Sequence, residues 1–201
     1  MSGPTPAQSL TLITADEVTL EAQLAPALDA SGSPPAAAVV CHPHPLYGGS
    51  MHNTVVDRLF AHLPSLGVPT LRFNFRGVGR STGTHGGGVD EMADVVAAID
   101  GLTELHPGVP VLLAGYSFGA DVALSVDDDR IAAWLAVSPP LRIVDPADMV
   151  AGADDRPTVI VSGTADDFRP ADRAAGVVAT WSATEVVPAD GVDHFWMAGL
   201  D

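Results

Sequence analysis

The chain has 201 residues, 47% of them hydrophobic and 17% charged, a balance that favours a packed domain over a disordered chain. Acidic residues outnumber basic ones by 25 to 9, and the net charge near -16 repels polyanions, so we expect neither nucleic acid nor an acidic membrane surface as a partner. A single cysteine, no readable signal peptide and no apolar run near the ~18 residues of a membrane span predict a cytoplasmic protein without an internal disulfide.

Strands and helices alternate along the chain after an initial strand pair. The pair is Ser9–Thr14 and Thr19–Leu24, and the Pro/Ala/Ser-rich stretch Pro26–Pro35 follows it as a loop. Six short apolar strands are expected next, and they are Ala36–Cys41, Thr70–Phe75, Val111–Gly115, Ile131–Val137, Thr158–Val161 and Thr184–Val187. The expected helices are Asn53–Ser65, Asp90–Leu105, Ser117–Ser125 and Pro170–Thr180.

Parallel strands need crossover connections, which helices usually provide. The alternation therefore predicts an α/β fold with a mostly parallel sheet and helices on both faces, in a single domain over residues 1–201. Ligands of such sheets bind at the carboxyl ends of the strands, so the informative residues should directly follow them.

The segment Gly115-Tyr116-Ser117-Phe118-Gly119 is the strongest local motif. In this G-x-S-x-G pattern a sharp strand-to-helix turn exposes the serine hydroxyl at the edge of the sheet. The turn crowds the positions two before and two after the serine, and both are glycine here. The helix that follows offers free N–H groups near a developing oxyanion. The pattern predicts Ser117 as a nucleophile; the alternative is an ordinary Gly/Ser loop.

A serine hydroxyl needs a base that takes its proton and a carboxylate that orients the base. His194 follows the last strand and is the only histidine in the C-terminal half of the chain, so we expect it to be the base rather than a surface histidine. Asp166, in the loop Ser162–Asp167, is the preferred acid. Three carboxylates remain alternatives, because a one-residue difference in the loop or an acid one strand earlier would select them: Asp167, Asp145 and Asp148.

The loop that follows the first parallel strand is expected to complete an oxyanion hole. One N–H donor would come from Phe118 and the second from this loop. Pro43 and Pro45 have no N–H, so the second donor is His44, with Leu46 as the alternative.

Two neighbouring motifs could also be interpreted as a zinc site and as a phosphate-binding loop. His42, His44 and His52 suggest a zinc site, but no cysteine or carboxylate cluster accompanies them at ligand spacing, so we expect neither a metal nor a cofactor. The turn Arg76–Ser81 lacks the lysine of a phosphate loop, and Arg76 is expected to pair with an acidic residue of the segment 90–94. Cys41, at the end of a strand, is expected to be a small core residue.

Five segments together resemble the small bacterial α/β-hydrolases known as serine aminopeptidase-like or dienelactone-hydrolase-like esterases, and they are CHPHPLYGGSMHN, RFNFRGVGRSTGTHGGGVDEMADV, LAGYSFG, SGTADD and DHFW. The similarity spans about Ala36–Trp196. It implies the α/β-hydrolase fold, a triad of Ser117, Asp166 and His194, and an oxyanion hole near His44 and Phe118. It supplies no substrate.

The chain departs from this family in two places. Leu141–Arg156 is too short for a cap domain, so the site is expected to be open and to favour short or accessible acyl groups. The chain stops at Asp201, seven residues past His194, where relatives usually continue into a closing helix. Either the member is shortened, or another element, such as the second subunit of a homodimer, covers that flank.

The sequence thus leads to the hypothesis of a serine hydrolase that cleaves small carboxylic esters or thioesters through an acyl-enzyme. The side chains expected to form the pocket walls, besides Phe118, are Tyr47, Leu46, Phe195 and Trp196. Two alternatives remain: an amide or peptide hydrolase that uses the same triad, and a non-catalytic binding protein with a hydrolase fold.

Overall fold

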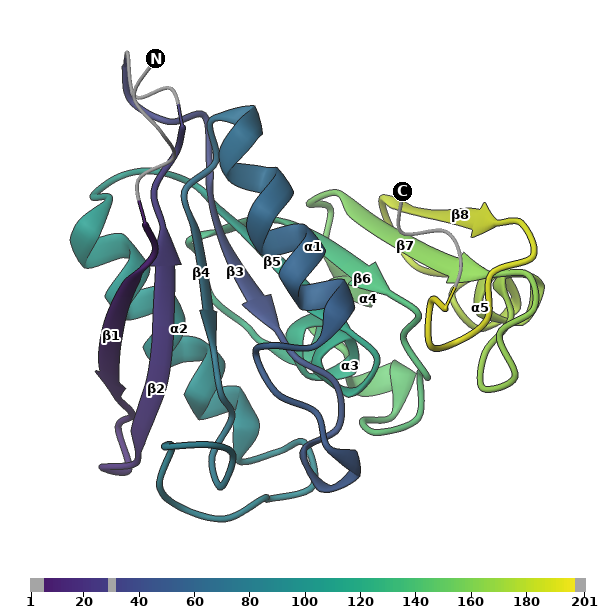
Figure 1. The fold of residues 1–201 in the computed structure, drawn as a ribbon. Helices are drawn as coiled ribbons and strands as arrows, with labels where there is room; N and C mark the ends of the chain where they lie inside the picture. Colours follow the sequence, from purple (N-terminus) through teal and green to yellow (C-terminus); the bar gives the residue numbers. More distant parts are fainter. Residues whose placement is uncertain (1–5, 29–31, 198–201) are drawn as a thin grey trace.

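The computed structural model describes residues 6–28 and 32–197, and within them eight strands form one sheet (Figure 1). The strands are β1 (Gln8–Ile13), β2 (Thr19–Ala25), β3 (Ala37–Cys41), β4 (Thr70–Phe73), β5 (Val111–Tyr116), β6 (Ile131–Val137), β7 (Thr158–Gly163) and β8 (Thr184–Ala189). Their order across the sheet is β1-β2-β4-β3-β5-β6-β7-β8. The pairs β1–β2 and β2–β4 are antiparallel, and each later pair is parallel. The prediction of an α/β fold with a mostly parallel sheet is therefore confirmed.

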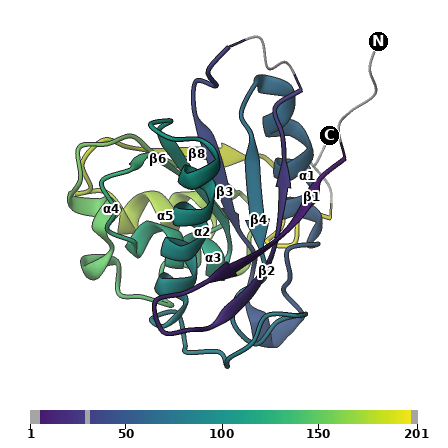
Figure 2. The ribbon, with the colours of Figure 1, turned by 90° about the vertical axis from the view of Figure 1, so that its left-hand side faces the viewer.

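Helices cover both faces of this sheet, as Figure 2 shows from the side. They are α1 (Thr54–His62), α2 (Glu91–Leu105), α3 (Phe118–Ser125), α4 (Val150–Ala153) and α5 (Ala171–Val177). The larger core lies between the sheet and α2 to α5, where Phe73, Ile99, Leu113 and Trp134 are almost fully buried. On the opposite face, α1 packs its Val56 against Ala38, Val40 and Ala114. Burial on both faces explains why the central strands are apolar without interruption.

Strand β3 illustrates this two-sided burial. Its five residues are all buried, with Ala37, Val39 and Cys41 in the larger core and Ala38 and Val40 on the α1 side. Cys41 is thus a core residue, as expected.

Several predicted boundaries are wrong by a few residues. The α-helix expected to run from Asn53 to Ser65 ends at His62, and Leu63–Leu66 form a 3-10 turn, because Pro64 cannot donate to the helix ladder. Asn53 is its N-cap, with a side-chain oxygen that accepts from the Val55 N–H at 3.0 Å.

Three short elements were not expected, and they are α4 and the 3-10 turns Pro45–Tyr47 and Pro146–Asp148. The predicted loop Pro26–Pro35 lies partly outside the described residues.

The connection between β6 and β7 holds only a 3-10 turn and the four-residue α4, so the prediction that no cap domain is inserted there is confirmed. Within the described residues, no helix combines the length and the apolar character that crossing a bilayer requires.

Candidate active site

Ser117 lies in a sharp turn between the central strand β5 and helix α3. Its backbone has φ +53° and ψ −121°, a conformation that L-residues rarely adopt and that surrounding contacts must hold. The Ser117 N–H donates to the Val137 carbonyl on β6 at 2.9 Å. A Cβ at Gly115 would overlap the backbone of Gly119, and a Cβ at Gly119 would overlap the carbonyl of His42. Both flanking glycines are therefore required by close backbone contacts.

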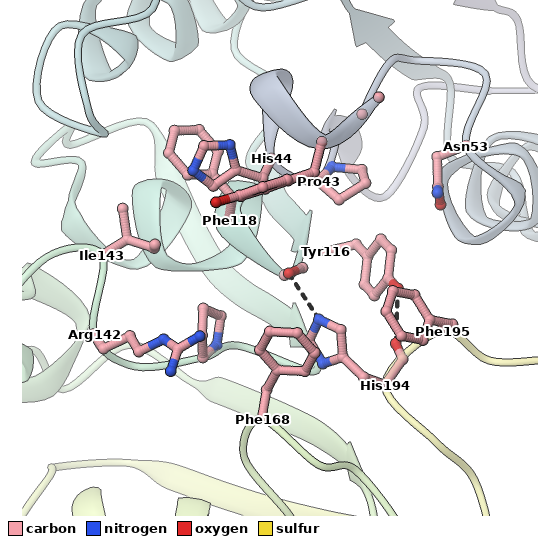
Figure 3. Close-up of a pocket in the computed structure, with 15 residues that line it drawn as sticks. Pro43, His44, Asn53, Tyr116, Phe118, Arg142, Ile143, Phe168, His194 and Phe195 are labelled. Carbon is pink, nitrogen blue, oxygen red and sulfur yellow. Dashed lines mark hydrogen bonds between the residues drawn. The ribbon is translucent and has the colours of Figure 1, made fainter.

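Three side chains from distant parts of the chain form a hydrogen-bonded row. Ser117 Oγ lies 3.0 Å from His194 Nε2, and His194 Nδ1 lies 2.8 Å from Asp166 Oδ2 (the first pair is dashed in Figure 3). The second oxygen of Asp166 accepts from the N–H groups of Phe168 at 2.8 Å and Arg169 at 2.9 Å. The three side chains that the sequence singled out thus meet in the order expected for a nucleophile, a base and an acid.

Asp166 is buried, which by itself would raise the pKa of its carboxyl. The hydrogen bond from His194 and the N–H groups of Arg169 and Phe168 outweigh this effect, and the net pKa lies below the ordinary value. Asp166 is therefore ionised near neutral pH and can hold the imidazole with its Nδ1–H directed at the carboxylate. None of the alternative acids contacts His194: Asp145 caps a 3-10 turn by accepting from the Ala147 N–H, and Asp148 and Asp167 are exposed.

The loops that carry Asp166 and His194 are joined to each other by backbone contacts. The Thr164 N–H donates to the Ala189 carbonyl at 2.9 Å, and the Ala165 N–H donates to the Val192 carbonyl at 3.1 Å. The Gly191 N–H donates to Thr164 Oγ1 at 2.8 Å. The candidate base and the candidate acid are consequently held on one connected unit beyond the ends of β7 and β8.

The candidate oxyanion donors are the backbone N–H groups of Phe118 and His44. Neither has an acceptor among residues 6–28 and 32–197, so both are free to bind a ligand oxygen. The Leu46 N–H already donates to His44 Nδ1 at 3.3 Å, which favours His44 over Leu46 as the second donor. The rings of His44 and Phe118 lie against each other with centroids 4.8 Å apart.

His42 supports this loop from below. Its Nε2 accepts from the Phe75 N–H at 3.0 Å, and its Nδ1 lies 2.6 Å from the Pro43 carbonyl, to which it donates. Burial lowers the pKa of His42 to about 4, so the ring is neutral near pH 7 and joins the loops that follow β3 and β4. Among the described side chains, no three histidine, cysteine or carboxylate groups gather closely enough to hold a metal ion.

A cavity of about 450 Å³ opens beside Ser117 and His194 (Figure 3). Tyr47 and Phe195, two of the expected walls, line it together with Phe118. Leu46 and Trp196 do not. Leu46 is 70% exposed, and the Trp196 indole is buried, with its Nε1–H donating to Ser138 Oγ at 3.1 Å.

Phe168, Arg142 and Ile143 also line the cavity, and sequence reasoning missed them. The Phe168 ring lies against the imidazole of His194 with centroids 4.3 Å apart. The available signal was their place in the loops that follow β6 and β7, on the side of the sheet where the parallel strands end.

Asp121 is a further residue that the sequence analysis missed. It lies one helical turn after Ser117 and is fully buried. Its carboxylate accepts from the N–H groups of Leu141, Arg142 and Ile143, each at 2.9 Å. Burial raises the pKa of Asp121 to about 6 despite these bonds, and the carboxylate that remains near pH 7 fixes the loop 141–143 to the helix of the nucleophile.

Comparison with known proteins places this chain in a family. The family model described as "Serine aminopeptidase, S33" matches residues 32–154. The uncharacterized protein RP471 of Rickettsia prowazekii is 37% identical over 169 residues, which cover 79% of this chain and 71% of the relative.

Two solved structures agree with this assignment. An α/β serine hydrolase homologue from Coxiella burnetii superposes with a TM-score of 0.85 at 31% identity and covers 97% of this chain and 92% of its own. The protein XC6422 of Xanthomonas campestris, described as an α/β serine hydrolase without a lid, superposes with a TM-score of 0.87 at 30% identity. The match covers 98% of this chain and 89% of XC6422. The chain therefore belongs to the serine aminopeptidase S33 family and is a hydrolase of the α/β type.

Proposed function

We propose that this hydrolase cleaves small carboxylic esters or thioesters through an acyl-enzyme on Ser117. The observation that carries the proposal is the unbroken row of hydrogen bonds from Ser117 Oγ to His194 at 3.0 Å and from His194 to Asp166 at 2.8 Å. In this row His194 is the base and Asp166 orients it.

In the first half-reaction, the hydroxyl proton of Ser117 moves to His194 Nε2 while Oγ forms a bond to the carbonyl carbon. The N–H groups of Phe118 and His44 stabilise the charge that develops on the carbonyl oxygen. The intermediate then collapses, the bond to the alcohol or thiol breaks, and the imidazolium of His194 returns its proton to that leaving group. Asp166 remains ionised throughout and stabilises the imidazolium.

In the second half-reaction, a water molecule takes the place of the leaving group. His194 accepts its proton, the hydroxide adds to the acyl carbon, and the same two N–H groups bind the oxyanion. Collapse releases the carboxylic acid and returns the proton to Ser117.

The preference for an ester over an N-terminal peptide bond rests on the cavity lining. An aminopeptidase must bind the free α-ammonium group of its substrate, and a carboxylate in the pocket is the strongest partner for that charge. None of the described residues that line the cavity is an aspartate or a glutamate. The family description nevertheless keeps amide cleavage as the second candidate. Rates on the p-nitrophenyl ester and the p-nitroanilide of the same acyl group separate the two, and faster anilide cleavage would favour the second.

The direct test is the variant Ser117→Ala assayed with p-nitrophenyl acetate. We expect the rate to fall by about 10³-fold or more, because no other hydroxyl or thiol of the described residues forms a hydrogen bond with the His194 imidazole. The matched control is Ser65→Ala, which removes an exposed hydroxyl outside the cavity and should leave the rate unchanged. A Ser117→Ala protein that keeps its turnover would refute the proposal.

A fluorophosphonate probe tests the remaining alternative, a non-catalytic binding protein. The wild type should be labelled covalently on Ser117, and His194→Ala should lose most of the labelling because the serine is then not activated. Absence of labelling in the folded wild type would favour the binding protein.

A further inference from the structure

The charge inside the cavity is opposite to the charge of the whole molecule. The chain has 25 acidic and 9 basic residues, yet no aspartate or glutamate occurs among the described residues that line the cavity. Within residues 6–28 and 32–197, the only lining side chain with a permanent charge is the guanidinium of Arg142. A substrate in this cavity therefore meets one positive charge.

The Arg142 guanidinium has no carboxylate partner among the described residues, and it lies over the face of the Phe168 ring, 5.3 Å from the ring centroid. Five other arginines form ion pairs with aspartate or glutamate, and they are Arg72, Arg76, Arg80, Arg130 and Arg156. In a protein with such an excess of acid, an unpaired guanidinium at the active site leaves its charge for a ligand.

The backbone that carries Arg142 is held in place. The N–H groups of Arg142 and Ile143 both donate to the buried carboxylate of Asp121. Figure 3 shows the Arg142 side chain extending from this loop into the cavity, toward Phe168 and His194. Phe168 in turn lies against the imidazole and donates its N–H to Asp166. The backbone of Arg142 is thus fixed to the helix that follows Ser117, and its guanidinium lies over the ring that packs against His194.

We propose that Arg142 is a specificity residue for esters or thioesters that carry a free carboxylate, such as the hemiester of a dicarboxylic acid. This inference rests on the hydrolase function proposed above and names its substrate class. The planar guanidinium can bind both oxygens of a carboxylate. A single cation balances that one charge, whereas a phosphate dianion would keep an unbalanced charge in a protein whose net charge is already -16. Ile143 and Phe168 offer apolar contacts for the methylene groups between carboxylate and ester.

The test compares two substrates that differ in this charge and by one methyl group: the p-nitrophenyl hemiester of glutaric acid and its methyl ester. For the wild type we expect the hemiester to have the higher kcat/KM. In Arg142→Gln the ratio of the two kcat/KM values should fall by about 10- to 100-fold, since hydrogen bonds to a charged group are lost. Arg142→Lys should retain part of the preference, because the charge remains but not the two-pronged geometry.

Arg173→Gln is the matched control. Arg173 is exposed on α5 and does not line the cavity, so its substitution makes the same change in net charge and should leave the ratio unaltered. An equal response of the ratio in Arg142→Gln and Arg173→Gln, or a wild type that prefers the methyl ester, would overturn the assignment of Arg142.

A binding measurement keeps the inference separate from the proposed chemistry. In Ser117→Ala, which cannot acylate, isothermal titration calorimetry should give a Kd for monomethyl glutarate at least tenfold lower than in Ser117→Ala/Arg142→Gln. Equal affinities would refute the carboxylate site even if the ester chemistry holds, and tighter binding of propyl phosphate would refute the choice of carboxylate. If neither ester is hydrolysed but the affinities differ as expected, the hydrolytic proposal fails and the anion site stands.

Discussion

Gly119 shows how one hydrogen atom in place of a side chain determines the position of the nucleophile. Its Cα lies against the backbone of Cys41 and His42, where a methyl group would overlap fixed atoms rather than a movable side chain. We expect Gly119→Ala to shift α3, to reduce ester hydrolysis by about 100-fold and to cost about 1–3 kcal/mol of unfolding free energy. Kinetics and urea unfolding measure the two effects.

Gly176 is the control for this prediction. It lies inside helix α5, and a Cβ there would meet no atom within 4 Å. Gly176→Ala should therefore be neutral or stabilising by up to about 1 kcal/mol. Equal damage from both variants would contradict the argument from close contact.

His42 makes stability depend on pH. The pKa of the folded state lies at about 4, below the ordinary 6.5, because burial disfavours the imidazolium. As the pH falls below 6.5, the unfolded chain binds a proton that the folded protein does not, so His42 reduces stability progressively until pH 4, by about 3 kcal/mol in total.

The measurement is the unfolding free energy of wild type and His42→Gln at several pH values. Relative to the variant, the wild type should lose stability between pH 6.5 and 4 and show no further change above pH 7. A constant difference over the whole range would show that His42 titrates normally in the folded protein.

The sequence singled out those residues whose proposed chemistry has a fixed order along the chain. Ser117, Asp166 and His194 each follow a recognisable strand, and their order restricts the choice. Arg142 and Asp121 could not be found in this way. Their roles depend on a loop that turns back at Leu141, which has φ +51°, and no pattern in the sequence specifies that turn.

The carboxylate of Asp121 joins helix α3 to the loop after β6. In Asp121→Asn, the amide nitrogen would face a backbone N–H, so at least one of the three bonds to residues 141–143 is lost. We expect a loss of about 1–3 kcal/mol in unfolding free energy and faster hydrogen exchange at these three amides. Asp129→Asn, an exposed site with the same charge change, is the control. Unchanged exchange would contradict the role of Asp121.

The N-terminal hairpin, the turn after β4 and helix α2 meet at Arg76. Its guanidinium donates to Asp94 at 2.8 and 2.9 Å and contacts Asp16 in the hairpin turn, and both Arg76 and Asp94 are buried. Of the acidic residues expected as partners in the segment 90–94, Asp94 is the one that pairs.

Asp94→Asn leaves the buried guanidinium without its main counter-charge, and we expect it to cost about 3–5 kcal/mol. Arg80→Gln breaks the ion pair of an arginine side chain that is 80% exposed, and should cost less than about 1 kcal/mol. Urea unfolding of both variants measures the difference, and a similar cost for the two would contradict the importance of burial.

The elements themselves were predictable because apolar periodicity determines which segments pack. Their ends were less so. The termination of α1 before Pro64 and the 3-10 turn at Pro45–Tyr47 depend on single proline and glycine residues. Such residues act locally, so the predicted end of a helix can differ from the observed end by a few residues.

The net charge of -16 lowers the unfolding free energy of the protein, because like charges repel one another more strongly in the compact folded state. Added NaCl screens this repulsion, so the unfolding free energy should rise by about 1 kcal/mol between low and high salt, which corresponds to roughly 2–4 °C in Tm. A scan in NaCl is preferable to one in sulfate, because sulfate also strengthens apolar burial. A fall in Tm with NaCl would show that the ion pairs outweigh the repulsion.

The order of strands is the part of the fold that periodicity could not supply. Alternation of strands and helices indicated a mostly parallel sheet, but it did not indicate which strands are neighbours. In the structure β4 lies between β2 and β3, and β5 pairs with the other side of β3. This arrangement results from long-range pairing of backbones, such as Val39 beside Leu71, and not from a local signal.

The position of β7 and β8 at one border of the sheet divides the proposed catalytic residues unequally. Ser117 emerges from the central β5, whereas Asp166 and His194 follow the last two strands and share one network of backbone bonds. If that border frays, His194 and Asp166 move away together while Ser117 stays in place. If Ser117 is acylated at that moment, as in the mechanism proposed above, no base is left to activate water. Transient fraying would therefore cause the acyl-enzyme to accumulate rather than only slow its hydrolysis.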